Sequence, residues 1–122
     1  MLLGVFSILY INIKKIRKEI TMNLLEDKLH LWLESSRFVK AKPGVYILYD
    51  KKNEVIYIGE TNNLQERFTK YLEANFEDDI CKQKTVAYQR EFFDNPKERQ
   101  NQLLEEYKNQ FGKVPLCNEN TD

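Results

Sequence analysis

The sequence predicts an α+β domain in which helices flank a small three-stranded antiparallel sheet. Two runs rich in β-branched and aromatic residues, 44–50 and 54–59, are joined by a short polar connector, which is typical of an antiparallel hairpin. A third strand pattern covers 84–93, and helical patterns precede, separate and follow these strands. The expected order is therefore helix, two strands, helix, strand, helix, with the helices packed on the sheet.

Composition limits the class of protein. The chain has 122 residues, of which 42% are hydrophobic, and this favours one globular domain. Lys and Arg together number 19, as do Asp and Glu, so bulk electrostatics alone would not hold nucleic acid. Because Cys81 and Cys117 match no metal-ligand spacing, we expect both thiols to be reduced and the protein to be cytoplasmic.

Residues 1–21 are expected to form an N-terminal extension outside the fold. The apolar run 2–13 is shorter than the ~20 residues of a membrane-spanning helix, so we expect no stable membrane span. Two interpretations of this segment stay open: the natural chain starts at Met22, or residues 1–20 form a weak interfacial anchor. The remaining parts are predicted to be an N-terminal helix and linker (22–42), the main domain (43–118) and a tail (119–122).

The first helix is predicted over 23–35, with Asn23 as its N-cap and a stripe of apolar residues at helical spacing. The stripe consists of Leu24, Leu25, Leu29 and Trp32. His30 lies off the centre of this stripe and has no second histidine near it, so we interpret it as a partly exposed helix residue rather than a metal ligand. The residue before Pro43 disfavours helix, which ends this part of the chain.

The register of the hairpin decides where two of its tyrosines point. If Asp50 opposes Asn53 at the turn, then Tyr46 opposes Tyr57. Directly opposed residues point to the same face of a sheet, so the two phenol rings are expected to lie side by side. A slip of one residue would place them on opposite faces.

The helix after the hairpin is predicted from a capping pattern and an apolar stripe. Asn62 with Gln65 three positions later resembles a capping box. Arg67 lies at the border of the buried face that follows. That face consists of Leu64, Phe68, Tyr71 and Leu72.

The last helix has the clearest boundaries. Asn95 is the expected N-cap, and Pro96 occupies the first helical position. The helix should run to about Phe111 and stop at Gly112, because glycine readily takes the left-handed conformation that ends helices.

Four short motifs stand out: "GVY" at 44–46, "YIG" at 57–59, the arginine of "ETNNLQERF" (Arg67) and "PLCN" at 115–118. Together they resemble the GIY-YIG nuclease superfamily. The resemblance covers roughly residues 43–118. In that family the domain is a three-stranded antiparallel sheet flanked by helices, which matches the predicted order of elements.

The resemblance implies hydrolysis of a DNA phosphodiester with one divalent metal, Mg²⁺ or Mn²⁺. Arg67 would stabilise the charge that develops on the phosphate, because its planar guanidinium stays protonated. Tyr46 and Tyr57 are the candidates to orient or deprotonate the attacking water. Gly59 and Asn63 are assigned to substrate binding. Taken alone, each of these residues also has an ordinary structural role, in sheet packing or at a helix surface.

The last helix and the tail would complete the site. Asn118 would fix the geometry through side-chain hydrogen bonds. Counting back from the terminal motif places Glu106 at the metal-binding position, with Glu105 as the alternative. An alignment that follows the apolar rhythm of the helix instead places Leu104 there. No metal ligand would then remain, and the protein would be a non-catalytic nucleic-acid- or protein-binding module on the same scaffold.

The residues around the motifs also bear on the substrate. Glu60 stands directly after "YIG", where relatives from DNA repair often carry lysine and another branch carries "YIGET". A carboxylate there repels phosphate unless it is paired. No zinc finger or helix-turn-helix module follows the domain, so specificity would come from its surface or from a protein partner. The resemblance leaves open whether the setting is DNA repair or a mobile element.

Overall fold

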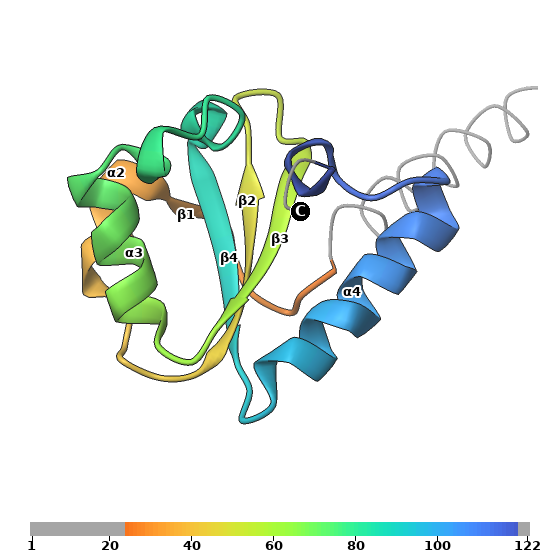
Figure 1. Ribbon diagram of the computed structural model, residues 1–122, viewed down its shortest axis with the longest axis horizontal. Coiled ribbons are helices and arrows are strands. Elements are labelled where there is room, and N and C mark those ends of the chain that lie inside the picture. The colour runs from red at the N-terminus through yellow and green to blue at the C-terminus, as the bar shows by residue number, and fades with distance from the viewer. Residues whose placement is uncertain (1–23, 120–122) are drawn as a thin grey trace, which may run out of the picture.

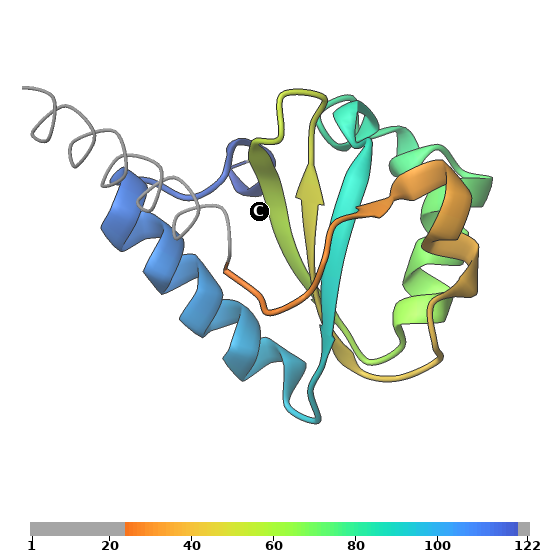
Figure 2. The same cartoon turned by 180° about the vertical axis from the view of Figure 1, so that it is seen from behind.

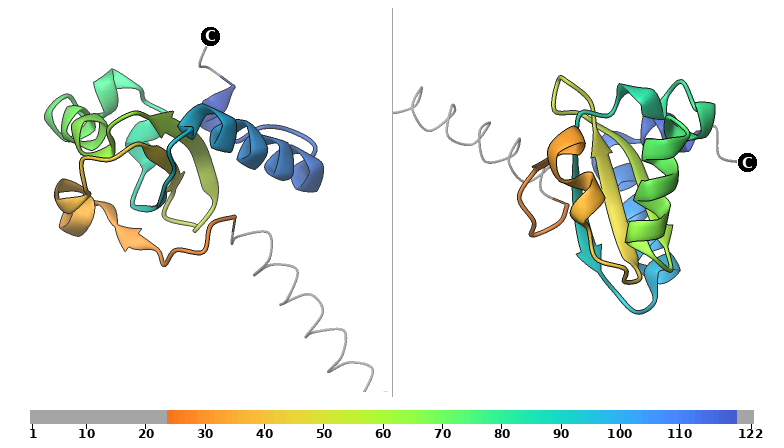
Figure 3. Two further views of the ribbon diagram at one scale, coloured as in Figure 1. Left: turned by 90° about the horizontal axis from the view of Figure 1, so that it is seen from below. Right: turned by 90° about the vertical axis from the view of Figure 1, so that its left-hand side faces the viewer.

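The computed structural model describes residues 24–119. The expectations for residues 1–21, including the interfacial anchor, lie outside this part of the chain. Two helices, α3 (Leu64–Glu73) and α4 (Pro96–Phe111), pack on opposite faces of one sheet (Figures 1 and 3). Among the described residues, no helix has the length and apolar character needed to cross a membrane.

The sheet is antiparallel throughout, with the strand order β1-β4-β2-β3. Its strands are β1 (His30–Leu31), β2 (Gly44–Tyr49), β3 (Val55–Thr61) and β4 (Ala87–Phe92). The predicted α+β class is therefore confirmed. The structure adds a fourth, two-residue strand at one edge, which is too short to leave a period-two pattern in the sequence.

The predicted register of the β2–β3 hairpin is wrong by two residues. Tyr46 opposes Gly59, not Tyr57. One residue of the shift comes from the turn, where the Asp50 backbone N–H donates to the carbonyl of Glu54 at 3.0 Å. The other comes from an irregularity in the ladder next to Leu48. Because a shift of two residues conserves the face of every side chain, the side-by-side placement of the tyrosines survives.

The predicted helix over 23–35 is also wrong. Only Trp32–Ser35 form a helix (α2), which a 3-10 turn at Ser36–Phe38 follows. The apolar residues of the stripe pack on opposite faces of the sheet: Leu24 and Leu25 join the α4 side, whereas Trp32 joins the α3 side. A single helix face cannot serve both sides, so this segment passes behind the sheet as an irregular, bent stretch before β1 (Figure 2).

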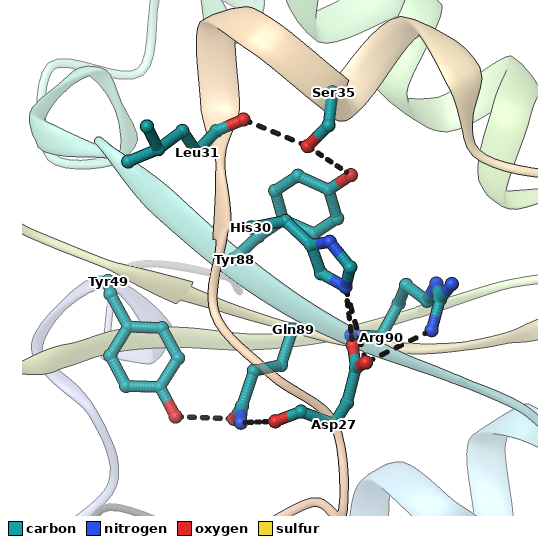
Figure 4. Close-up of polar contacts among 8 residues, drawn as sticks. All are labelled: Asp27, His30, Leu31, Ser35, Tyr49, Tyr88, Gln89 and Arg90. Atoms are coloured by element: carbon teal, nitrogen blue, oxygen red, sulfur yellow. Dashed lines mark hydrogen bonds and ion pairs between the residues drawn. The ribbon is translucent and has the colours of Figure 1, made fainter.

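Polar contacts fix this crossing segment to β4 (Figure 4). The Asp27 carboxylate accepts from the Arg90 backbone N–H at 3.0 Å and contacts the Arg90 guanidinium at 3.2 Å. It also lies 3.0 Å from His30 Nε2. The Gln89 amide bridges the Asp27 carbonyl and the Tyr49 hydroxyl. His30 is therefore a strand residue paired with Asp27, and the prediction of a helical His30 is wrong.

The two long helices begin and end at defined caps. Asn63, not Asn62, is the N-cap of α3, and its side chain accepts from the Glu66 backbone N–H at 3.0 Å. The predicted boundaries of α4 are confirmed, including the end at Gly112, which has a φ of 78°.

The tail after α4 folds back onto the sheet and is tied there by a disulfide. Cys117, in the 3-10 turn Leu116–Asn118, is bonded to Cys81, just before the 3-10 turn Lys82–Lys84. The two Cα atoms are 5.6 Å apart, within the usual disulfide range. The prediction that both thiols are reduced is therefore wrong. The spacing of the cysteines in the sequence could not show the bond, because their proximity depends on how the tail folds. The expectation of a cytoplasmic location was based on reduced cysteines, so the disulfide removes its support.

Each face of the sheet has its own core. The α3-side core is mainly aromatic and includes Trp32, Tyr46, Tyr57, Phe68, Tyr71 and Tyr88. The α4-side core is mainly aliphatic and includes Leu25, Val45, Ile47, Ile58 and Leu103. The face that carries the two tyrosines of the motifs is thus the face that α3 covers.

Candidate active site

A cluster of three phenols and one guanidinium lies between the sheet and α3. The Tyr46 hydroxyl, from β2, is 2.6 Å from the Tyr71 hydroxyl, from α3. Arg67 Nη1 donates to the same Tyr46 oxygen at 3.3 Å. The ring of Tyr57, from β3, is centred 5.9 Å from that of Tyr46, so the predicted common face is confirmed. We refer to these four residues as the tyrosine cluster.

Strand pairing and a glycine position the Tyr46 ring. Gly59 is its partner on β3, and the ring end lies directly over that residue. A Cβ atom at position 59 would be 2.3 Å from Tyr46 Cζ and 2.6 Å from Tyr57 Cε2. The space that Gly59 provides is therefore filled by Tyr46.

The helix α3 supplies the other two members of the cluster. Arg67 and Tyr71 are four residues apart, so they lie on the same face of the helix. The backbone N–H of Arg67 donates to the carbonyl of Asn63 at 3.0 Å in the first turn. Asn63, predicted to bind substrate, uses its side-chain oxygen to cap this helix.

Burial sets the protonation states of the cluster. It raises the pKa of Tyr46 well above the usual value of a phenol, and the nearby Tyr71 raises it further. Burial also raises the pKa of Tyr57, although the ammonium of Lys82 opposes this shift. Burial alone would lower the pKa of Arg67, but the Tyr46 oxygen beside it raises the pKa overall. At neutral pH Tyr46 and Tyr57 are therefore protonated and the Arg67 guanidinium is charged.

Asn118 lies at the edge of the sheet, next to the cluster. Its side-chain oxygen accepts from the Ile58 N–H at 2.9 Å, and its amide nitrogen donates to the Ile58 carbonyl at 3.0 Å. The Gln100 side chain, from α4, donates to the same carbonyl at 3.1 Å. These bonds occupy the outer edge of β3 between Tyr57 and Gly59, and so they hold the strand that carries both residues.

The two candidate metal ligands lie elsewhere. Glu105 and Glu106 are exposed on α4, which buries Leu103 and Tyr107 against the opposite face of the sheet from the tyrosine cluster. Within residues 24–119, no group of three or more His, Cys, Asp and Glu side chains could hold a metal ion. A preformed metal cage is thus absent from the described residues. They fit only a metal held by one carboxylate together with substrate phosphate and water, as Mg²⁺ commonly is.

One member of the tyrosine cluster and one residue beside it were not predicted as functional. Tyr71 was assigned only to the buried stripe of its helix, although its spacing from Arg67 places both on one face. Lys82, whose ammonium lies 4.0 Å from the centre of the Tyr57 ring, has no comparable signal. Its position depends on an irregular loop that no periodicity describes.

Comparison with known families settles the relationship of the chain. The model of the GIY-YIG catalytic domain matches residues 42–113, more than half of the sequence. The chain belongs to the GIY-YIG family. The resemblance predicted from the four motifs is therefore confirmed, and membership supports a nuclease type of activity for this GIY-YIG domain.

The relatives found among curated proteins share only part of their length with this GIY-YIG chain. UvrABC system protein C of Shewanella baltica (strain OS155) is 46% identical over 39 residues, which cover 32% of the chain and 6% of the relative. The protein of the same name from Methanosphaera stadtmanae is 41% identical over 54 residues, or 44% of the chain and 9% of the relative. The chain thus spans less than a tenth of the length of these relatives.

Proposed function

We propose that this protein is a metal-dependent endonuclease that hydrolyses phosphodiester bonds in DNA. The observation that carries the proposal is the hydrogen-bonded row of Arg67, Tyr46 and Tyr71 on one face of the sheet. A phosphodiester is anionic, and attack on it places further charge on its oxygens. A half-buried guanidinium beside hydroxyl groups is suited to stabilise that charge.

The protonated state of the phenols limits what they do. With its pKa raised by burial, Tyr46 enters the reaction as a neutral hydroxyl rather than a phenolate. We infer that it acts by hydrogen bonding, accepting from Arg67 and exchanging a hydrogen bond with Tyr71. Tyr57, which the charge of Lys82 makes the easier of the two to ionise, is the better candidate to orient the attacking water.

Mg²⁺ or Mn²⁺ is the proposed cofactor. Glu106 and Glu105, the carboxylates expected to bind it, are exposed on α4, across the sheet from the tyrosine cluster. A metal at the cluster would therefore be held mainly by substrate phosphate and water. Once bound, the metal would neutralise charge on the phosphate oxygens. The protein's own contribution lies in Arg67 and the phenols. Asn118 and Gln100 support that contribution from the edge of the sheet, where they keep β3 in place.

The setting of this activity is also a proposal. Similarity to UvrABC system protein C favours DNA repair over a mobile element, with DNA as substrate and a protein partner that supplies specificity. A cytoplasmic location now rests on the DNA substrate alone, because the disulfide argues the other way.

A second candidate is a non-catalytic binding module on the same scaffold. It is favoured by the exposed position of both candidate carboxylates and by the lack of an acidic cluster within the described residues. In addition, the α4 side chain that reaches the β3 edge beside the cluster is Gln100, a neutral amide.

Nicking of supercoiled plasmid DNA separates the two candidates. We expect cleavage with Mg²⁺ or Mn²⁺ and none with EDTA. Arg67→Ala should lower the rate about 100- to 1,000-fold, the usual loss for one group that stabilises transition-state charge. Arg37→Ala removes the same charge from an exposed site on the 3-10 turn after α2 and should leave the rate unchanged. An intact wild-type protein that binds DNA but never cuts it would support the binding module.

A further inference from the structure

Lys82 places a second positive charge at the tyrosine cluster. Its ammonium nitrogen lies 4.0 Å from the centre of the Tyr57 ring and 5.6 Å from that of Tyr71. Only 14% of its side chain is exposed. Removing a lysine from water is unfavourable unless the charge is compensated. Here the Asp79 carboxylate forms an ion pair with it at 3.8 Å, a distance longer than a hydrogen bond, so the ammonium keeps hydrogen-bonding capacity for a further anion.

The backbone around Lys82 is fixed on several sides. Its N–H donates to the Asp79 side chain at 3.2 Å, and its carbonyl accepts from the Thr85 hydroxyl at 2.7 Å. The residue before it, Cys81, is bonded to Cys117 in the tail. The backbone of Lys82 is therefore fixed by the fold, and its largely buried side chain places the ammonium over Tyr57.

The carboxylate directly after the "YIG" motif, that of Glu60, does not oppose phosphate binding at the tyrosine cluster. Glu60 follows Gly59 on β3 and pairs with Val45, whose side chain lies in the α4-side core. Because neighbouring residues of a strand point to opposite faces, Glu60 projects away from the tyrosine cluster. A phosphate at the cluster would then meet Arg67 beside Tyr46 and Lys82 beside Tyr57, on two rings whose centres are 5.9 Å apart.

We propose that Lys82 is a substrate-binding residue that contacts a phosphate of the nucleic-acid backbone. This inference rests on the proposed function and extends it, because it assigns the second cation of the site to a loop. The alternative is that Lys82 only covers the Tyr57 ring. An apolar side chain could also cover that ring, but it would lack the electrostatic attraction of a cation for phosphate.

The salt dependence of binding measures this contact directly. Binding of a fluorescein-labelled DNA duplex to the full chain is followed by anisotropy in EDTA, between 50 and 200 mM salt. Loss of one phosphate contact should reduce the slope of log Kobs against log salt by about 0.9. We expect this reduction for Lys82→Met and for Lys82→Gln, and a slope close to wild type for Lys82→Arg. Two neutral variants are used so that a folding defect in one does not decide the result.

Lys108→Met is the matched control. It removes the same charge from an exposed position on α4, which covers the other face of the sheet, and should leave the slope unchanged. The inference is overturned if folded Lys82→Met and Lys82→Gln keep the wild-type slope while wild type binds and nicks DNA. If wild-type protein neither binds nor cuts DNA, the proposed function fails, and the inference fails with it.

Discussion

Gly59 is the residue on which the tyrosine cluster depends for space. Replacing it with alanine places a methyl group 2.3 Å from Tyr46 Cζ, so the ring has to move. We expect Gly59→Ala to lower the free energy of unfolding by about 1–3 kcal/mol, as overpacking does. Nicking should fall with it, because the Tyr46 hydroxyl leaves Arg67 and Tyr71.

Urea denaturation and the plasmid assay check this prediction together. Gly112→Ala is the control, since no atom lies within 4 Å of the added methyl group. Its φ of 78° is strained for alanine, so a cost of about 1 kcal/mol is expected there without loss of nicking. Equal stability of Gly59→Ala and wild type would contradict the packing described for Tyr46.

The hydroxyl of Tyr46 is the second single group whose removal is informative. Tyr46→Phe deletes the 2.6 Å bond to Tyr71 and the acceptor of Arg67. We expect a stability loss of about 1 kcal/mol, the net value of a buried hydrogen bond. Nicking should fall about 100-fold, because Arg67 loses the hydroxyl that positions it to stabilise transition-state charge.

Tyr49→Phe is a close control for Tyr46→Phe. Tyr49 is equally buried, and its hydroxyl donates to Gln89 at 2.6 Å, but its side chain lies in the α4-side core. It should show a similar loss of stability in urea and a wild-type rate of nicking. Equal loss of nicking in both variants would mean that the tyrosine cluster has no special role.

At the scale of elements, the sequence predicted the helix boundaries that are set by interactions between residues close together in the chain. The helix α4 was predicted with its boundaries, because Asn95, Pro96 and Gly112 each act within one turn of the chain. The segment at 23–35 was mispredicted because its apolar residues serve two cores on opposite faces of the sheet. Nothing in the spacing of these residues distinguishes that arrangement from a single helix face.

The disulfide is an element-level feature that sequence reasoning missed. It joins residues 36 positions apart and links the loop that carries Lys82 to the tail that carries Asn118. A closed loop of this length is worth about 3 to 4 kcal/mol through the entropy of the unfolded chain. We expect reduction by TCEP to lower the free energy of unfolding by that amount.

Urea denaturation with and without TCEP measures this effect. The double variant Cys81→Ser with Cys117→Ser should unfold at the same urea concentration in both conditions. Two titratable thiols in the untreated wild-type protein, with no effect of TCEP, would show that the bond does not form in solution.

At the scale of the whole molecule, the sheet separates two different interiors. The α3-side core gathers aromatic rings and the hydroxyls of Tyr46 and Tyr71, whereas the α4-side core is mostly aliphatic. The sequence predicted that Tyr46 and Tyr57 share one face of the sheet and that Tyr71 lies in the buried stripe of its helix. It did not predict that α4, with Glu106, lies on the second, because the side of the sheet that a helix covers depends on the path of the whole chain.

The same division leads to a prediction about alkaline stability. Burial raises the pKa of Tyr46 and Tyr49, one in each core, above the value of about 10 that phenols have in an unfolded chain. The folded state therefore holds these protons more tightly than the unfolded state does. Their contribution to stability is complete below pH 10 and is lost as the pH rises from there through the folded pKa values.

We expect the free energy of unfolding to fall above pH 10, by about 1 kcal/mol for each fully buried tyrosine at pH 11. Urea denaturation between pH 8 and pH 11 measures the slope, and absorbance at 295 nm reports when the phenols ionise. Tyr49→Phe should reduce the slope, because the variant lacks one phenol whose pKa is raised by burial. A stability that stays constant to pH 11, with all phenols ionising near pH 10, would mean that the rings reach water freely. The closed aromatic face, on which the proposed chemistry of Arg67 and Tyr46 depends, would then not exist in solution.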